Sequence, residues 1–225
     1  MIEKPATTLR LDLHNHTRGS FDCLSDPEAL LERARARGID RIGITDHNRL
    51  GVAMEMFERH PDAVIPGEEV KTREGIDLIG LFITREIPKG TAAEAACHLI
   101  REDGGIVYLP HPYASGKGGG GRYAETLAPL VDVVEVFNAR LHPGRLNQPA
   151  EDLAKRHGKL RGAGSDAHTL REIAGAWVDV PAHENEPAAL LKALAQGEVR
   201  GRTAPLWIHV ASTWAKVRKK LPGLD

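Results

Sequence analysis

Short apolar segments alternate with amphipathic ones along most of the chain, and this alternation restricts the fold more than any other feature of the sequence. Segments such as Arg41–Thr45 and Val131–Phe137 are rich in β-branched residues, which is typical of buried strands. Between the strands lie helical patterns. One begins with Asp26 as an N-cap and Pro27 in the first turn, and it ends at Gly38. Strands and helices that alternate with short connections favour parallel strands joined by helical crossovers.

The expected elements fit a single α/β barrel. Strands are expected at 9–13, 41–45, 63–66, 76–84, 105–109, 131–137, 160–163 and 176–180, and helices at 26–38, 50–59, 92–102, 123–130, 146–157 and 186–196. About seven strands in a chain of this size, several of them apolar on both faces, predict a closed or nearly closed α/β barrel. An open doubly wound sheet is the alternative, although no Gly-x-Gly-x-x-Gly motif follows the first strand.

The composition excludes several other classes of protein. The 225 residues include 41% hydrophobic and 27% charged residues, and the net charge of −1 argues against a bulk electrostatic grip on nucleic acid. The two cysteines, Cys23 and Cys97, lack the paired spacing of a disulfide framework or a thiolate zinc site. No apolar run approaches the ~20 residues of a membrane helix, and the N-terminus has no signal-peptide core. A cytoplasmic protein without a membrane partner is therefore expected.

Polar clusters follow the expected strands. They are His14-Asn15-His16, Asp46-His47, Glu68-Glu69, His111, the pair Glu135 and Asn138, and Ser165-Asp166-Ala167-His168. Each cluster lies at the carboxyl end of its strand, and in a barrel these ends meet on the face that carries the active site. The sequence therefore predicts one site to which all six clusters contribute.

The residue types of these clusters indicate a metal site. Imidazole and carboxylate groups without thiolates suit Zn, Mn or Fe, and eight or more ligands imply two or three divalent ions. In a strand, His14 and His16 point to the same side, and Asp166 and His168 repeat that spacing. Several divalent ions together can activate water and stabilise a phosphoryl displacement. No Gly-x-Ser-x-Gly motif offers a competing serine nucleophile.

The order of the motifs resembles that of the polymerase-and-histidinol-phosphatase (PHP) superfamily. The similar segments are Asp12-Leu13-His14-Asn15-His16-Thr17, Ser20-Phe21-Asp22, Ile44-Thr45-Asp46-His47-Asn48, Pro66-Gly67-Glu68-Glu69, His111-Pro112, Glu135-Val136-Phe137-Asn138-Ala139-Arg140 and Gly164-Ser165-Asp166-Ala167-His168. They span about residues 11–175. The resemblance implies a distorted seven-stranded (β/α)7 barrel, similar to a TIM barrel, with a site for two or three metal ions.

The resemblance also implies a role for individual residues. It assigns His14, His16, Glu69 and Asp166 to one ion, Glu69 and His111 to a second, and Asp22, His47 and His168 to a third. Glu69 is preferred to Glu68 because the family pattern reads Gly-x-Glu, and Glu68 is expected on the other face of the strand in a surface pair. Asp77 stands where many members have a histidine ligand, and it could bind a metal through oxygen. Asp46 is expected to orient a ligand histidine.

The substrate is expected to be a phosphate ester, either a phosphorylated small molecule or a nucleotide. Arg18 and Arg140 are the candidate phosphate-binding cations, because a guanidinium group can bind phosphate in a bidentate manner. A surface salt bridge is the alternative for either arginine. The alternative functions are an exonuclease acting on short oligonucleotides, a non-catalytic metal-binding regulatory module, and an amidohydrolase with similar metals.

A glycine-rich stretch at 115–121 follows the fourth polar cluster. It lacks the Lys-Ser/Thr ending of a phosphate-binding loop, so a flexible connection is the simpler interpretation. The alternative is a mobile flap from which Lys117 and Arg122 reach an anion.

The last residues, 205–225, have helical spacing and lie outside the alternating pattern. We expect residues 1–204 to form the barrel and 205–225 to form a helix that packs Trp207 and Trp214 against it. The basic residues near the end of this helix suit its C-terminal dipole, and a membrane or nucleic-acid contact is the alternative.

Overall fold

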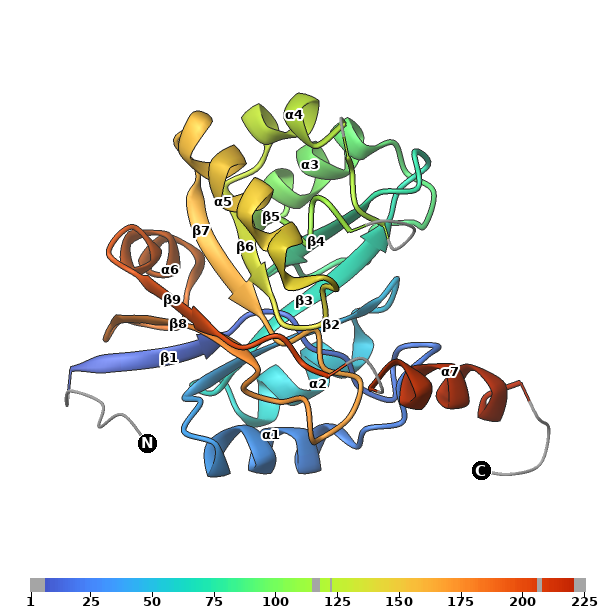
Figure 1. Cartoon of the computed structure of the whole chain (residues 1–225). Coiled ribbons are helices and arrows are strands. Elements are labelled where there is room, and N and C mark those ends of the chain that lie inside the picture. The colour runs from blue at the N-terminus through green and yellow to red at the C-terminus, as the bar shows by residue number, and fades with distance from the viewer. Residues whose placement is uncertain (1–6, 115–117, 122, 206–207, 221–225) are drawn as a thin grey trace.

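The protein is an α/β structure in which a single curved sheet is covered on its outside by helices (Figure 1). The computed structural model describes residues 7–114, 118–121, 123–205 and 208–220. The strands are β1 (Thr8–Asp12), β2 (Arg41–His47), β3 (Val64–Lys71), β4 (Asp77–Leu81), β5 (Ile106–Leu109), β6 (Val133–Asn138), β7 (Leu160–Gly164), β8 (Ala176–Pro181) and β9 (Glu198–Gly201). The helices are α1 (Pro27–Ala36), α2 (Gly51–Arg59), α3 (Ala93–Glu102), α4 (Tyr123–Leu127), α5 (Asn147–Arg156), α6 (Pro187–Leu194) and α7 (His209–Arg218), with 3-10 turns η1 (Ala128–Leu130) and η2 (Gly144–Leu146).

The sheet has nine strands in the order β7-β6-β5-β4-β3-β2-β1-β8-β9, so the expected barrel type is confirmed but the expected strand number is not. Strands β1, β2 and β3 run parallel to one another, as do β5, β6 and β7. Strand β4 is antiparallel to both of its neighbours. The reason is that β3 and β4 are joined by a tight turn at Gly75, where φ is +80°, and not by a helix. The amino end of β4 therefore lies beside the carboxyl ends of the parallel strands.

The barrel closes where the chain leaves β1 and β7. The Asp166 N–H donates to the His14 carbonyl at 2.7 Å, and the His16 N–H donates to the Ala167 carbonyl at 3.0 Å. These hydrogen bonds place two sequence motifs that are about 150 residues apart side by side. The same contacts that complete the barrel thus bring the first and last polar clusters together.

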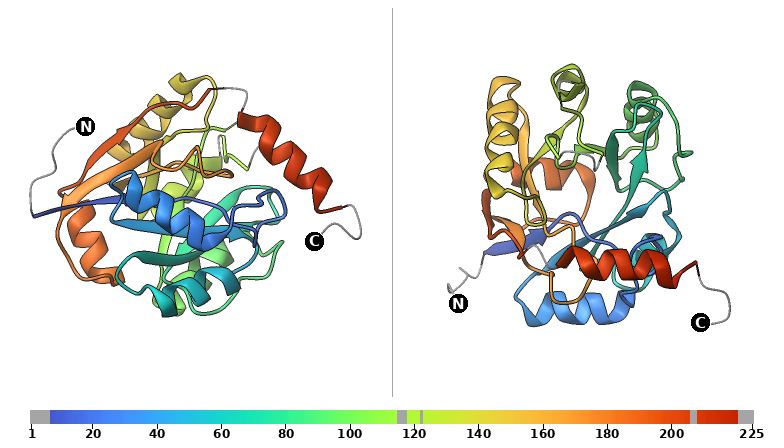
Figure 2. Two further views of the ribbon diagram at one scale, coloured as in Figure 1. Left: turned by 90° about the horizontal axis from the view of Figure 1, so that it is seen from below. Right: turned by 45° about the vertical axis from the view of Figure 1, so that its right-hand side comes forward.

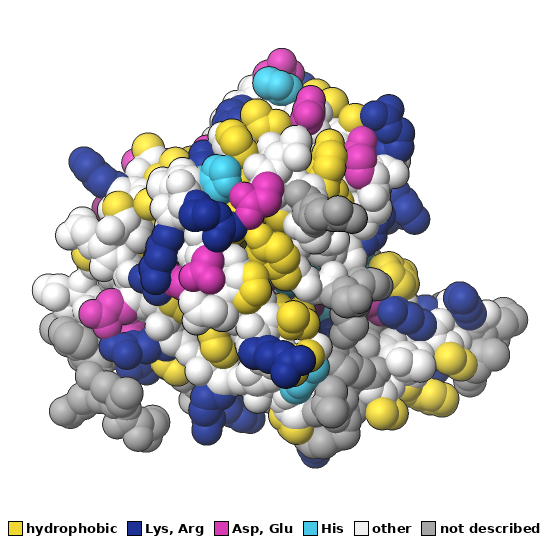
Figure 3. Space-filling view, turned by 45° about the horizontal axis from the view of Figure 1, so that its top comes forward, with side chains coloured by type: hydrophobic (Ala, Val, Ile, Leu, Met, Phe, Trp, Pro, Cys, Tyr) yellow, Lys and Arg dark blue, Asp and Glu magenta, His cyan; other side chains and the backbone are white. Residues whose placement is uncertain are grey.

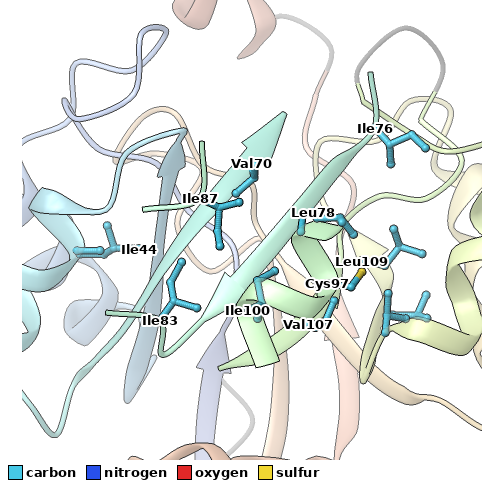
Figure 4. Close-up of a cluster of buried hydrophobic side chains, with 14 of the residues drawn as sticks. Ile44, Val70, Ile76, Leu78, Ile83, Ile87, Cys97, Ile100, Val107 and Leu109 are labelled. Atoms are coloured by element: carbon cyan, nitrogen blue, oxygen red, sulfur yellow. The ribbon is translucent and has the colours of Figure 1, made fainter. Parts of the chain in front are cut away.

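Apolar side chains fill the barrel and the space between the sheet and the helices. Figure 4 shows the part beneath α3, where Cys97 and Ile100 lie beside Leu78 of β4 and Val107 of β5. All four are fully buried, and a buried side chain of the size of Ile or Leu contributes about 1.5–3 kcal/mol. This packing supports the strands that carry the polar clusters at their ends.

Helix α7 stands off from the barrel, as both views of Figure 2 show. The side that meets the body carries Ser212 and Ala215, which are buried. Trp214 is 58% exposed and Val210 is 69% exposed, and Figure 3 shows apolar side chains on the outside of this projection. The expectation that Trp214 packs on the barrel is therefore wrong, and Trp207 lies outside the described residues. In the described part of the chain, no helix is both long and apolar enough for a membrane crossing.

Two glycines provide a matched test of the β1–β2 packing. A Cβ atom at Gly43 would lie 2.4 Å from the carbonyl oxygen of Leu13, whereas a Cβ at Gly51 would meet nothing within 4 Å. We expect Gly43→Ala to lower the free energy of unfolding by about 2 kcal/mol or more, because backbone has to move. Gly51→Ala should leave it unchanged or slightly raised. Chemical denaturation of both variants measures this, and equal stabilities would contradict the described contact.

Candidate metal centre

The carboxylate of Glu69 lies at the middle of a buried group of histidines. Its Oε2 atom is 3.0 Å from His47 Nδ1, which is on the adjacent strand in register with it. The same oxygen is 3.3 Å from His16 Nε2 and 3.4 Å from His14 Nε2. Its Oε1 atom is 3.2 Å from His111 Nε2. One buried carboxylate therefore contacts four imidazole rings that come from three different places in the sequence.

Two further carboxylates complete the cluster on its other side. Asp166 Oδ1 lies 3.3 Å from His16 Nε2 and 3.5 Å from His168 Nδ1. Asp22 Oδ2 lies 3.3 Å from His168 Nε2 and 3.7 Å from His47 Nε2. The structure thus brings together all eight side chains that the resemblance assigned to the three ions. Asp166 has a φ of +51°, a conformation that Asp tolerates better than most residues and that often occurs at functional sites.

Glu135 positions two of these histidines from the layer beneath them. Its Oε1 atom is 3.0 Å from His14 Nδ1 and accepts the hydroxyl of Tyr108 at 3.1 Å. Its Oε2 atom accepts the His111 N–H at 2.7 Å and an amide N–H of Asn138 at 2.9 Å. With a metal ion at Nε2, a proton on His14 Nδ1 would be held by this carboxylate, which would fix the orientation of the ring. The sequence had placed Glu135 at the site without assigning it this role.

Asp46 acts on the cluster through a neighbour. Its carboxylate accepts the Thr17 N–H at 2.6 Å and the Ser20 hydroxyl at 2.9 Å. The Ser20 oxygen is in turn 3.0 Å from His16 Nδ1 and accepts the His47 N–H at 2.9 Å. Asp46 therefore lies one hydroxyl away from the histidine that it was expected to orient. Ser20 has a site role that the sequence analysis missed, although it lies within a quoted motif.

Burial and neighbouring charges lower the pKa of one histidine of the cluster and raise the pKa of another. Burial, together with His168 and His47, lowers the pKa of His16 to about 3, which keeps its ring neutral and able to donate a lone pair. Burial would lower the pKa of His47 as well, but Glu69 outweighs it and raises that pKa to about 9. Burial opposes ionisation of Glu69 and Asp166, yet the facing histidines hold the pKa of both carboxyls well below the ordinary range.

The donor set fits divalent metal ions. Three groups of donor atoms each lie within 4.8 Å of one another, namely His14-Glu69-His111, His14-His16-Asp166 and His16-His47-His168. Within the described residues, the buried atoms Asp22 Oδ1 and His111 Nδ1 have no hydrogen-bond partner. Buried carboxylate oxygens and imidazole nitrogens suit Zn, Mn or Fe, whose charge would compensate the cost of burying the carboxylates.

Asp77 lies beside this cluster. It is at the amino end of β4, which the antiparallel direction of that strand brings to the site. Its Oδ1 atom is 2.6 Å from Lys71 Nζ, and burial together with Glu69 raises its pKa to about 6. None of the three donor groups found among the described residues includes Asp77. Its N–H donates to the carbonyl of Gly118, so the described end of the glycine-rich stretch is packed here; Lys117 and Arg122 lie outside the described residues.

The two candidate phosphate-binding arginines have different surroundings. Arg140 is buried, and its Nε lies 3.0 Å from Glu172 Oε1 while its Nη1 lies 4.0 Å from Asp166 Oδ1. Arg18 has a side chain that is 55% exposed and paired with Asp26, the N-cap of α1. The structure brings Arg140 into the site and leaves Arg18 outside it.

A cavity of about 520 Å³ opens above the cluster and has a cationic rim. Lys71, Lys89 and Arg140 line it from the barrel, and α7 adds Ser212 and Lys216. Helix α7 is held there because the Ser212 hydroxyl accepts a hydrogen bond from Arg140 at 3.0 Å. Lys216 Nζ lies 3.6 Å from Asp22 Oδ2 and 5.3 Å from the centre of the Phe21 ring.

The contribution of α7 to the site was not predicted. Ser212 and Lys216 are four residues apart and thus share one face of the helix, but the sequence does not say what that face meets.

Glu68 differs from the surface residue that was expected. It does point away from the cluster, but it is fully buried, and its Oε2 atom accepts the Ile87 N–H at 2.9 Å. Burial raises its pKa to about 7. The segment that follows β4 covers this side of β3, which the sequence pattern could not indicate.

Comparison with known proteins agrees with this geometry. Residues 12–100 match the sequence profile of the PHP domain, and residues 144–199 match that of a PHP-associated segment. The uncharacterized protein MJ1587 of Methanocaldococcus jannaschii is 36% identical over 156 residues, which cover 63% of this chain and 89% of that protein. The chain belongs to the PHP superfamily.

Solved structures share the PHP fold at low sequence identity. A two-domain protein from Bacteroides vulgatus that contains a predicted PHP-like metal-dependent phosphoesterase has a TM-score of 0.70 and 17% identity, covering 89% of this chain and 68% of that one. The lesion-specific endonuclease PfuEndoQ from Pyrococcus furiosus has a TM-score of 0.66 and 13% identity, covering 85% of this chain and 57% of that one. The resemblance on which the expected barrel rested is therefore confirmed.

Glu69 and Glu68 form a matched pair for testing the centre. We expect Glu69→Gln to weaken metal binding by at least about a hundredfold, because four histidines lose their shared carboxylate. Glu68→Gln should bind metal as the unchanged protein does, since Glu68 faces the opposite side of β3. Competition with a chelator measures both affinities, and an equal loss in the two variants would argue against the described centre.

Proposed function

We propose that this chain is a metal-dependent hydrolase that cleaves phosphate esters, with a phosphomonoester or a nucleotide as its substrate. The proposal depends on one observation: a cluster of five histidines and three carboxylates lies at the base of a cavity with a cationic rim. Membership of the PHP superfamily supports the metal dependence. The similarity in fold to a predicted phosphoesterase supports a phosphate ester as the bond that is cleaved.

The cluster would hold two or three divalent ions. His14, His16, Glu69 and Asp166 are the proposed ligands of one ion, Glu69 and His111 of a second, and Asp22, His47 and His168 of a third. Ions bound there would lower the pKa of a coordinated water and neutralise charge on the substrate. Asp77 forms an ion pair with Lys71 and lines the cavity, so it is proposed to shape the cavity.

The remaining polar groups would bind the phosphoryl group of the substrate and orient the histidines. Arg140 is fixed on one side by Glu172 and on the other by Ser212, so its guanidinium group is presented with little freedom. Preorganised cations of this kind stabilise phosphoryl oxygens without reorganisation during the reaction. Lys216 adds a positive charge from α7 above Asp22. Glu135 and Ser20 keep the rings of His14 and His16 in place from below.

A second candidate is hydrolysis of short oligonucleotides. The fold similarity to a lesion-specific endonuclease favours this possibility. A net charge of −1 argues for a ligand that is held locally and not for a long strand bound through many phosphates. We therefore propose the small phosphate ester first and treat the oligonucleotide as the alternative substrate.

A phosphate-release screen tests the proposed reaction. Sugar phosphates, nucleotides and short oligonucleotides are supplied with Mn, Zn or Fe, and His14→Ala and Asp166→Ala are compared with the unchanged protein. We expect turnover with at least one substrate and a loss of about a thousandfold in both variants, because each removes a metal ligand. Far-UV circular dichroism checks that the variants fold. Unchanged turnover in the variants would contradict the proposal, and bound metal without any turnover would favour the regulatory module.

Lys216 provides a separate test of the cationic rim. We expect Lys216→Gln to raise KM for the best phosphate ester about tenfold and to change kcat little, because a rim charge binds ground state and transition state alike. Lys220→Gln, just beyond the same helix and exposed, is the matched control and should have no effect. Steady-state kinetics measures KM and kcat for both variants. An equal KM in the two variants would contradict a role of α7 in substrate binding.

A further inference from the structure

A second cavity, of about 610 Å³, lies outside the metal centre and is rich in arginine. It is bounded by α1, by the loop between β7 and β8, by residues 202–205 after β9 and by Ile208 before α7. In Figure 1, helix α1 lies below the loop between β7 and β8. Among the described residues, its charged lining consists of Arg33, Arg37, Arg171, Arg202 and the single acid Glu172. Four guanidinium groups against one carboxylate give this cavity an excess of three positive charges, whereas the whole chain has a net charge of −1.

The excess is not neutralised from within the described part of the protein. Glu172 turns toward the metal centre, where its Oε1 atom is 3.0 Å from Arg140 Nε and its Oε2 atom accepts the His168 N–H at 3.1 Å. No ion pair among the described residues involves Arg37, Arg171 or Arg202. Like charges gathered without counter-charges repel one another, and a bound anion would relieve this repulsion.

The wall of this cavity is firmly held. Ala174 adopts the left-handed conformation, with a φ of +61°, and its N–H donates to the buried carboxylate of Asp12 at 3.2 Å. The next N–H, of Gly175, donates to the Ser165 hydroxyl at 2.8 Å. On the opposite side, Arg33 donates from its Nε to the carbonyl of Leu170 at 3.3 Å. Strained backbone that the surroundings fix in this way is common at ligand sites.

We propose that this cavity binds a phosphate-bearing anion at a site distinct from the metal centre. Guanidinium groups recognise phosphate oxygens through paired N–H donors, and the three exposed arginines are available for such contacts. The volume lies within the range of small-molecule sites, so the ligand is a phosphorylated compound or one segment of a nucleic-acid strand, whose shared chemistry is the phosphate group. The proposal does not depend on the reaction proposed above.

The arginine side chains themselves report on binding. The full chain with its bound metals is labelled with ¹⁵N-arginine, and the Nε–H NMR signals of Arg171 and Arg202 are assigned from their loss in Arg171→Gln and Arg202→Gln. The protein is titrated with inorganic phosphate and, separately, with a six-nucleotide single-stranded DNA. Arg35→Gln, on the exposed part of the same helix α1 but outside the cavity lining, is the matched control.

We expect the signals to shift to saturation and the dissociation constant to rise about tenfold in Arg171→Gln and in Arg202→Gln, but not in Arg35→Gln. A DNA affinity at least tenfold above that for inorganic phosphate identifies a strand as the source of the anion, and similar affinities identify a free phosphate group. Thermal unfolding confirms that the substituted surface residues leave the fold intact. Signals that do not move with either ligand, or affinities that are equal in all three variants, would overturn the proposal.

Discussion

The buried carboxylate of Glu69 is the interaction on which the site depends. Four imidazoles from three separate parts of the chain face it within 3.4 Å, and all are largely removed from water. Without this negative charge the protonated rings would repel one another, and without the rings the buried carboxylate would be too costly to ionise. The cluster is thus stable only as a unit, and added divalent cations fit the same balance because they replace protons between the same donors.

The fold brings these groups together by two devices. Barrel closure joins the segment after β1 to the segment after β7 through backbone hydrogen bonds, so His14 and Asp166 are set by the ladder and not only by their side chains. The antiparallel direction of β4 brings Asp77 to the same face from an amino end. A barrel made only of parallel strands would place such a residue on the opposite face.

Sequence reasoning and the family resemblance found the residues of the cluster because these residues lie in short local motifs after the strands. His14 and His16 share a side through the two-residue repeat, and His47 and Glu69 are paired on adjacent strands. Sequence reasoning missed the features that depend on contacts between distant parts of the chain. The burial of Glu68 depends on the segment around Ile87, and the place of Lys216 depends on how α7 docks. The four-residue strand β9 is too short for a periodic signal, and the pairing of Arg18 with the N-cap residue Asp26 could not be predicted from a motif.

Glu172 links the two cavities physically. One oxygen holds Arg140 at the rim of the metal centre, while the other accepts the backbone N–H of His168 and the hydroxyl of Thr169. The same residue lines the arginine cavity, next to Arg171. These contacts hold the Glu172 carboxylate against Arg140 and His168, on the side of the metal centre. The carboxylate therefore does little to neutralise the arginines of the second cavity. The four arginines give the second cavity its positive charge, and the contacts of Glu172 with Arg140 and His168 turn the one acid among its described lining residues away from them.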